Sequence, residues 1–219
     1  KNGWYSRFYG YPAWNAIKNM SEKILGKEFD KLIESLSKLP SIGEKTASRL
    51  ALYLMKNPPD LTLQIAKSMV EARKKVKICH ICNNFIFNKS CICSDKSRNK
   101  KLLCIVENVF DLISIEQGGH YNGQYHVLQG LLSASKGVSP KDLNIEKLIS
   151  KIKKTNYDEI IFATDPTSDG EFTAQFIFGE IKNYCKSISR IAIGMPIGSE
   201  VDYIDKNTLA KSFIDRKRM

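Results

Sequence analysis

The sequence predicts an α+β protein of several domains, in which a helical domain, a cysteine-rich segment and an α/β domain follow one another. Residues 20–77 place apolar side chains at helical spacing, and four of the six cysteines lie between positions 79 and 93. Beyond them, short apolar runs alternate with helical patterns through residues 99–194, and this alternation is typical of a parallel sheet.

We therefore expect five segments along the 219 residues. They are an extension at 1–19, a helical domain at 20–77, a cysteine-rich segment at 78–98, an α/β domain at 99–194 and a C-terminal region at 195–219. The extension holds both tryptophans, Trp4 and Trp14, and no acidic residue, whereas Met20 would make a natural start. Residues 1–19 are a segment added for expression, an upstream extension or a flexible arm that stacks on bases.

The composition favours a polyanion as partner. The net charge is +11 and the pI is about 9.3, as in many nucleic-acid-binding proteins. The same charge would also follow from the coding bias that the abundance of Ile, Lys and Asn indicates. The chain has no run of eighteen apolar residues and no secretory signal, so we expect a reduced, cytoplasmic protein without a membrane span.

The first two helices are predicted on either side of a tight turn. Apolar residues recur at helical spacing through residues 28–38, Leu39-Pro40 ends that pattern, and a second helix opens at Glu44. The turn Ser41-Ile42-Gly43 completes the pattern L-P-x-I-G-x-K-x-A-x-R, which is a helix–hairpin–helix signature.

This signature presents groups that bind a phosphate backbone without reading base sequence. Gly43 allows the turn to approach a phosphate closely, and the N–H groups that open the next helix carry partial positive charge. Lys45 and Arg49 are four residues apart, so they share one helix face and can reach adjacent phosphates. Ser41 stands where the commonest form of the motif has glycine, which keeps one amide of the turn further from a phosphate. The alternative is a helical hairpin that only packs a core.

A third helix is predicted from Thr62 to about Lys77, after a break at Asn57-Pro58-Pro59-Asp60. It leads into the cysteines through the basic run Arg73-Lys74-Lys75-Val76-Lys77. That run is either a solvated face or part of a DNA path.

Two cysteine pairs, Cys79/Cys82 and Cys91/Cys93, predict a structural Zn²⁺ site. Four thiolates hold zinc tetrahedrally and leave no position open for water or substrate, so such a metal is structural. The second pair is C-x-C, one residue shorter than the usual C-x2-C. Free thiols at a degenerate site, or a disulfide, are therefore the alternatives.

Other residues near the cysteine pairs have simpler interpretations. His80, Asp95 or Cys104 would be the replacement ligand if the short pair failed to bind. Otherwise His80 is solvated between its flanking cysteines, and Cys104 and Cys185 are core residues in apolar surroundings.

The α/β domain is predicted to contain four strands and intervening helices. The expected strands are 102–106, 125–128, 159–163 and 188–193, and the expected helices open near Asn108 and span about 145–154 and 171–184.

Two acids follow predicted strands, at the edge where parallel sheets place their chemistry. Glu107 and Asp165 could together hold Mg²⁺ there. Metal-dependent phosphoryl transfer usually needs more carboxylates, and Thr167 cannot replace one. Asp169 would help only if its loop folds back, so the acids are either structural or catalytic. We expect His126 to be a satisfied interior or surface histidine.

From about Met20 to Arg216 the chain resembles the RecR family of bacterial recombination mediators. The matching stretches, in order, are LPSIGEKTASRLA at 39–51, the cysteine pairs, SDKSR at 94–98, LCIVE at 103–107, GQYHVL at 123–128, ATDPTSDGEFTA at 163–174, GMPIG at 194–198, EVDYID at 200–205 and Thr208-Leu209.

The resemblance implies a helix–hairpin–helix domain, a zinc finger, a Toprim domain and a C-terminal region that serves oligomerisation. It also implies a ring-shaped tetramer that encircles DNA. Such proteins act with RecO and RecF in loading RecA onto gapped, SSB-coated single strands, and they have no established catalysis of their own.

The resemblance also assigns residues. Lys45 and Arg49 match the family's DNA-contacting positions, and Glu107 and Asp165 match Toprim acids. The Toprim D-x-D is D-x-T here, which fits binding rather than strand cleavage, and the second cysteine pair departs from the family's C-x2-C. Two other functions remain open: a Mg²⁺-dependent strand-cleaving enzyme, and a zinc-stapled protein-interaction module whose charge is incidental.

Overall fold

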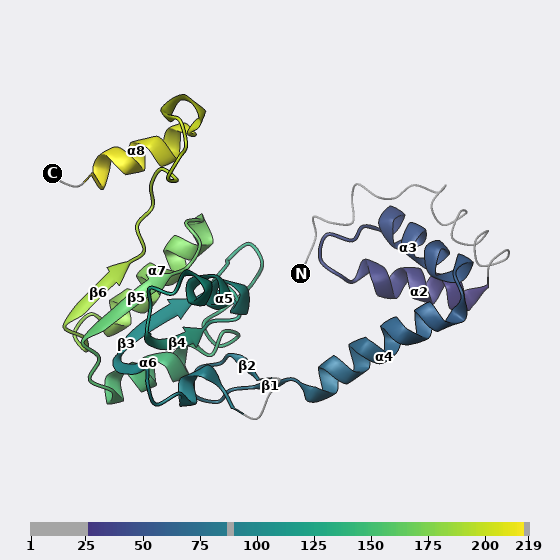
Figure 1. Cartoon of the computed structure of the whole chain (residues 1–219), viewed down its shortest axis with the longest axis horizontal. Coiled ribbons are helices and arrows are strands. Elements are labelled where there is room, and N and C mark those ends of the chain that lie inside the picture. Colours follow the sequence, from purple (N-terminus) through teal and green to yellow (C-terminus); the bar gives the residue numbers. More distant parts are fainter. Residues whose placement is uncertain (1–25, 87–89, 217–219) are drawn as a thin grey trace. The chain divides into compact units, whose positions relative to one another are not determined.

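The structure is a computed structural model that describes residues 26–86 and 90–216 (Figure 1). Its contacts divide the chain into an N-terminal unit that ends at Lys75 and a C-terminal unit that begins at Val76. The predicted extension at 1–19 lies outside the described residues. None of the described helices is both long and apolar enough to cross a membrane.

The N-terminal unit consists, over its described residues, of helices α2 (Lys27–Ser37), α3 (Glu44–Lys56) and α4 (Pro59–Lys75). Helix α2 packs against α3, whose buried residues Ala47 and Ala51 are small enough to allow close approach. Helix α4 starts three residues before the predicted Thr62, because proline is tolerated in the first helical turn.

The C-terminal unit is built on a four-stranded sheet in which all neighbouring strands are parallel. Its strands are β3 (Asn99–Val106), β4 (Gly123–Val127), β5 (Glu159–Ala163) and β6 (Ser187–Arg190), in the spatial order β4-β3-β5-β6. The predicted strand at 188–193 is therefore shorter than expected and ends at Arg190. The predicted α+β multidomain fold is confirmed.

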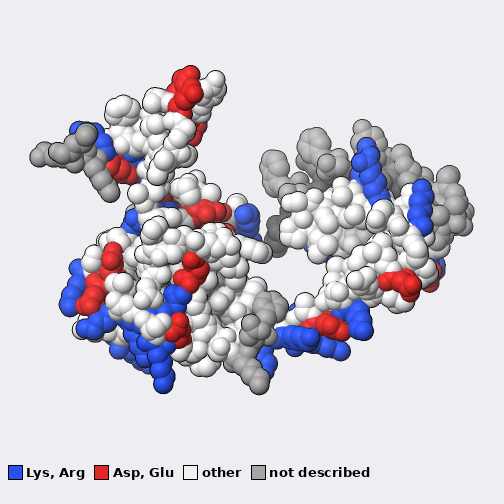
Figure 2. Space-filling model, viewed as in Figure 1, with Lys and Arg blue, Asp and Glu red and all other residues white. Residues whose placement is uncertain are grey.

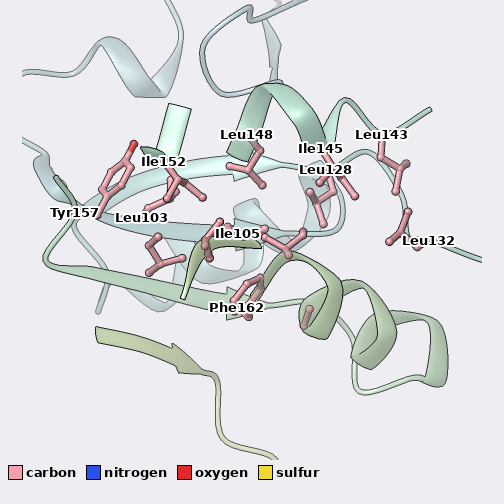
Figure 3. Close-up of a cluster of buried hydrophobic side chains, with 14 residues drawn as sticks. Leu103, Ile105, Leu128, Leu132, Leu143, Ile145, Leu148, Ile152, Tyr157 and Phe162 are labelled. Atoms are coloured by element: carbon pink, nitrogen blue, oxygen red, sulfur yellow. The ribbon is translucent and has the colours of Figure 1, made fainter. Parts of the chain in front are cut away.

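Helices cover both faces of this sheet. They are α5 (Val109–Gly118), α6 (Ile145–Lys154) and α7 (Ser168–Ile181). Side chains of β3 alternate between two buried clusters: Leu103 and Ile105 face α6 and α7, whereas Cys104 and Val106 face the side of α5. Figure 3 shows side chains of α6 directed toward the strands in the first of these clusters. Cys104 is thus a core residue, as predicted.

Short elements complete the C-terminal unit. Strands β1 (Lys77–Ile78) and β2 (Phe85–Ile86) pair antiparallel around the first cysteine pair, and a 3₁₀ turn, η1 (Ile92–Ser94), contains the second. After β6 come a 3₁₀ turn, η2 (Val201–Tyr203), and helix α8 (Lys206–Ile214), which the sequence did not predict.

Candidate functional site

The turn between α2 and α3 holds the backbone of the helix–hairpin–helix. Backbone N–H groups of Leu39 and Ile42 donate to the carbonyls of Leu36 and Leu39, both at 3.1 Å. Gly43 precedes α3, and its carbonyl accepts the first hydrogen bond of that helix from Ala47 at 2.9 Å. Within residues 26–86 and 90–216 no side chain caps the start of α3, so its first N–H groups are available to an anion.

Lys45 and Arg49 lie on the solvent side of α3. Both are exposed, whereas Ala47 and Ala51 are buried. Positions two residues apart on a helix differ by about 200° around its axis, so the cationic and buried pairs occupy opposite faces. No ion pair of Lys45 or Arg49 occurs among the residues that the structure describes. Both charges therefore remain available to a polyanion.

Ser41 has a left-handed backbone conformation, with φ of 64°. A non-glycine residue pays a steric cost in this region because its Cβ approaches the backbone. The position that usually carries glycine in this motif therefore has the geometry that favours glycine, although serine occupies it.

The last turn of α4 is basic. Arg73, Lys74 and Lys75 are all exposed, and Figure 2 shows Lys and Arg side chains gathered at this end of the helix. Both interpretations of the run, a solvated face and part of a DNA path, are compatible with this exposure.

Cys79, Cys82, Cys91 and Cys93 form a group that could hold a metal ion, with all four Sγ atoms within 4.8 Å of one another. The Sγ atoms of Cys79 and Cys93 lie 3.5 Å apart, and those of Cys82 and Cys91 lie 3.3 Å apart. Tetrahedral zinc with Zn–S bonds of about 2.3 Å needs sulfur atoms about 3.8 Å apart. The donor set and its spacing therefore fit zinc, which would staple the two cysteine pairs together.

Local hydrogen bonds shape each half of the group. After Cys82 the chain turns at Asn83, whose φ is 59°, and the N–H of Asn83 donates to the carbonyl of Cys79 at 2.9 Å. The N–H of Ser94 donates to the carbonyl of Cys91, also at 2.9 Å, and this 3₁₀ turn brings Cys93 back toward the first pair. The short C-x-C spacing is therefore compatible with convergence of all four thiols.

The proposed replacement ligands do not join this group: His80 and Asp95 are not among its members, and Cys104 lies in the core. The turn from Cys79 to Asn83, which we call the cysteine turn, is hydrogen-bonded to the edge strand β4. There, the N–H of Val127 donates to the carbonyl of Cys82 at 2.9 Å, and the side chain of Asn83 donates to the carbonyl of Val127 at 2.8 Å.

The thiols differ in acidity when no metal is bound. Burial raises the pKa of Cys93 to about 12 and raises the pKa of Cys82 still further. Burial also acts on Cys79, but hydrogen bonds from backbone N–H groups of Cys82 and Ile81 outweigh it and lower the pKa to about 7. A metal must therefore displace protons from at least two of these thiols.

Glu107 and Asp165 follow neighbouring strands, since Val106 pairs with Ala163 in the sheet. Glu107 is half-buried, and its Oε2 has no hydrogen-bond partner in the described structure. Burial and the nearby charge of Asp165 raise its pKa. Across the described ranges, the cysteines are the one group of three or more possible ligands that converges, so the acids form no comparable metal site.

Thr167, which stands where the Toprim D-x-D pattern has its second aspartate, has a structural role. Thr167 caps α7 by accepting the N–H of Gly170 at 3.1 Å, so the helix opens at Ser168 rather than at the predicted 171. The loop also binds Arg190, which donates to the carbonyl of Asp165 at 3.3 Å and forms an ion pair with Glu171 at 3.1 Å.

His126 differs from the sequence-based expectation. It is buried on β4, with 4% of its surface exposed, but neither ring nitrogen has a hydrogen-bond partner among the described residues. The expectation of an interior histidine was right, and the expectation of a satisfied one was wrong. Tyr125 and Val127 face the cluster on the α5 side, so strand alternation places the His126 side chain on the opposite face of the sheet. The sequence could have given this direction.

Comparison with known families matches three regions of the chain. The model of the RecR helix-hairpin-helix matches residues 29–73, that of the Toprim domain matches 101–192, and that of the RecR C-terminal region matches 194–217.

Full-length relatives are similar as well. A protein of Pelotomaculum thermopropionicum named recombination protein RecR is 40% identical over 194 residues, which cover 88% of this chain and 97% of the relative. Proteins of the same name from Carboxydothermus hydrogenoformans and Rhizobium meliloti are 42% and 40% identical, over 85% and 87% of the chain and 94% and 96% of the relatives. Identity at this level over nearly the whole of each relative means that the chain belongs to the RecR family of recombination proteins.

Proposed function

We propose that this protein is a sequence-independent DNA-binding clamp of recombinational DNA repair. It acts with RecO and RecF to help load RecA onto gapped single-stranded DNA, and it catalyses no reaction itself. The observation that carries the proposal is the uncapped start of α3 after Gly43, beside the exposed cations of Lys45 and Arg49. This arrangement grips phosphates and contains no group placed to read base edges.

Oligomer formation would raise DNA affinity, because each protomer contributes only a small set of phosphate contacts. Exposed apolar side chains support an oligomer, which we propose to be a ring-shaped tetramer with a contact in region 195–219. On α8, Phe213 and Ile214 are 64% and 71% exposed, and on α4, Leu63 is 65% exposed. Several weak phosphate contacts on one ring bind one DNA strand with much higher combined affinity.

Zinc is the metal that we propose for the cysteine group. Its role is structural, since it links the cysteine turn to the 3₁₀ turn and thereby braces the edge of the sheet. We further propose a cytoplasmic, nucleoid-associated location, which follows from the proposed role on DNA.

The function is tested by fluorescence anisotropy with single-stranded, double-stranded and gapped DNA of several sequences, alone and with RecO. We expect similar affinities for all sequences and a loss of at least tenfold in the variant Lys45→Ala/Arg49→Ala. A matched variant, Lys56→Ala/Lys67→Ala, removes two exposed cations of the same unit and should bind as the parent does. If Lys45→Ala/Arg49→Ala binds DNA as well as the parent does, the hairpin only packs, and the DNA path would move to Arg73–Lys77 and Arg98–Lys101 or to the partner protein.

A second candidate function is Mg²⁺-dependent strand cleavage at Glu107 and Asp165. The observation in its favour is the buried, unpaired Oε2 of Glu107, which a cation would neutralise. Supercoiled DNA incubated with Mg²⁺ or Mn²⁺ distinguishes the two functions. We expect no nicking, and reproducible nicking that Asp165→Ala abolishes would replace the clamp by an enzyme.

A further inference from the structure

A cavity of about 640 Å³ lies within the C-terminal unit, between the cysteine turn and α6. Its polar lining includes Asn83, His126, Asn144, Lys147 and Lys151. The lining includes no acidic residue. A cavity of this volume is within the range that holds small ligands of nucleotide size.

His126 supplies an unsatisfied polar group to this cavity. Its ring is 4% exposed, and both nitrogens lack a hydrogen-bond partner among the described residues. A buried polar group left unpaired costs about 1–3 kcal/mol, so a native structure normally satisfies it. Burial and the charge of Lys151 lower the pKa of His126 to about 3, so the ring is neutral and offers one donor and one acceptor.

Two lysines on α6 supply positive charge. Lys147 is exposed and Lys151 is half-buried, and the Nζ of Lys151 lies 3.4 Å from the carbonyl of Ile81. Within the described part of the chain neither lysine forms an ion pair. Figure 2 shows Lys and Arg side chains gathered over the α6 region of the unit. The cavity thus combines cations with hydrogen-bonding side chains and has no acidic group in its lining.

We propose that this cavity binds a phosphate group, either as inorganic phosphate or as the phosphomonoester of a small nucleotide. The two ammonium groups neutralise its negative charge. One phosphate oxygen forms a hydrogen bond with one ring nitrogen of His126, because the two nitrogens point in divergent directions and a single phosphate cannot reach both. A phosphodiester or a carboxylate carries one negative charge, whereas inorganic phosphate and a phosphomonoester carry up to two near neutral pH, so the two lysines bind the latter more strongly. This site is separate from the helix–hairpin–helix and does not depend on DNA binding there.

A simpler role for Lys151 competes with this proposal. Burial is the larger influence on Lys151 and lowers its pKa, whereas Cys82, Cys93 and Cys79 favour its charged form when they are ionised. Lys151 would then serve only as a counter-charge for the cysteine group. That role requires no ligand in the cavity, and it predicts that loss of Lys151 weakens metal retention without affecting any phosphate.

Isothermal titration of the zinc-loaded protein tests the proposal. The titrants are inorganic phosphate, adenosine monophosphate, an oligonucleotide without terminal phosphate and an acidic peptide, all at one ionic strength. The variant Lys45→Ala/Arg49→Ala serves as background, so that the hairpin does not contribute. We expect one saturable site for the first two titrants and at least tenfold weaker binding of the last two.

Variants of α6 identify the site. Lys147→Met/Lys151→Met should weaken phosphate binding at least tenfold, whereas Lys153→Met/Lys154→Met, on the same helix outside the cavity, should not. Side-chain nitrogen resonances should shift on saturation for His126 and remain in place for His120, which does not line the cavity. Absence of saturable phosphate binding would overturn the proposal, as would equal weakening by both α6 variants. Zinc content, measured for every variant, would then reveal a counter-charge role if Lys147→Met/Lys151→Met loses metal and Lys153→Met/Lys154→Met does not.

Discussion

The loop after β5 passes so close to Gly170 that this position has no room for a side chain. A Cβ at this position would lie 2.0 Å from the backbone carbonyl oxygen of Asp165, which cannot move away independently. We expect Gly170→Ala to lower the free energy of unfolding by at least about 2 kcal/mol, as measured by urea denaturation. Gly179, also in α7, has open space around it, so Gly179→Ala should raise stability by about 0.5–1 kcal/mol. Equal effects of the two changes would contradict the close approach.

Ser41 offers the opposite case, in which glycine should help. Ser41→Gly removes the strain of a left-handed residue and should raise the free energy of unfolding by up to about 1 kcal/mol, after the larger entropy loss of glycine. Ser41→Ala keeps a Cβ and should bring no gain. We would compare urea midpoints of the three proteins, and a destabilised glycine variant would argue against the left-handed turn.

Glu107 should make stability depend on pH. Because burial and Asp165 raise its pKa in the folded state, the favourable contribution of the protonated form is complete below the unfolded pKa. That contribution is lost as the pH rises through the raised folded pKa. Glu107→Gln stays neutral, so its Tm should match that of the parent near pH 4 and exceed it increasingly toward pH 7. The exposed change Glu180→Gln serves as control. A Tm difference that does not vary with pH would mean that the charge of Glu107 is not what destabilises the parent.

At the scale of elements, the cysteine group should stabilise the C-terminal unit through a bound metal. We expect about one zinc ion per chain, a lower Tm after chelation and loss of zinc in Cys93→Ser. Cys185→Ser changes a thiol outside the group and should retain the metal. Because the pKa values of Cys82 and Cys93 are raised, zinc affinity should fall as the pH decreases, with proton release on binding. Zinc retention by Cys93→Ser would mean that the short pair is not a ligand pair.

The elements that the sequence predicted well are those whose apolar pattern is fixed by burial. Residues 102–106 and 160–163 of these strands are continuous apolar runs, and both strands lie in the central, doubly covered part of the sheet. Strands β1 and β2 are two residues long and owe their pairing to the cysteine turn, so periodicity could not reveal them. Helix α8 is nine residues long and has no buried residue, so burial does not impose an apolar periodicity that would reveal it.

Parts of the candidate site were predictable for a similar reason. The positions of Lys45 and Arg49 on one exposed face follow from helix geometry alone, as does the meeting of Glu107 and Asp165 at one sheet edge. The orphaned nitrogens of His126 were not predictable, because they depend on which groups of distant segments lie around the ring. The roles of all these residues in binding DNA, metal and partner proteins stay predictions.

At the scale of the whole molecule, DNA affinity should depend on assembly. Phe213→Glu/Ile214→Glu places charge on the exposed apolar face of α8 and should dissociate the oligomer in sedimentation experiments. In the proposed ring, the combined contacts would raise affinity by about 10²-fold or more, so the dissociated variant should bind DNA correspondingly more weakly. Lys206→Glu, an exposed charge change on the same helix, should leave assembly intact. Equal affinity of oligomer and protomer would count against a clamp.

The most direct test of the central claim is the salt dependence of DNA binding by the assembled protein. If Lys45 and Arg49 bind phosphates, the logarithm of the binding constant should fall linearly with the logarithm of salt concentration. In Lys45→Ala/Arg49→Ala the slope should then be smaller in magnitude by about one for each DNA phosphate that the variant no longer binds. An unchanged slope in this variant, with Lys56→Ala/Lys67→Ala as the matched control, would contradict DNA binding by the helix–hairpin–helix.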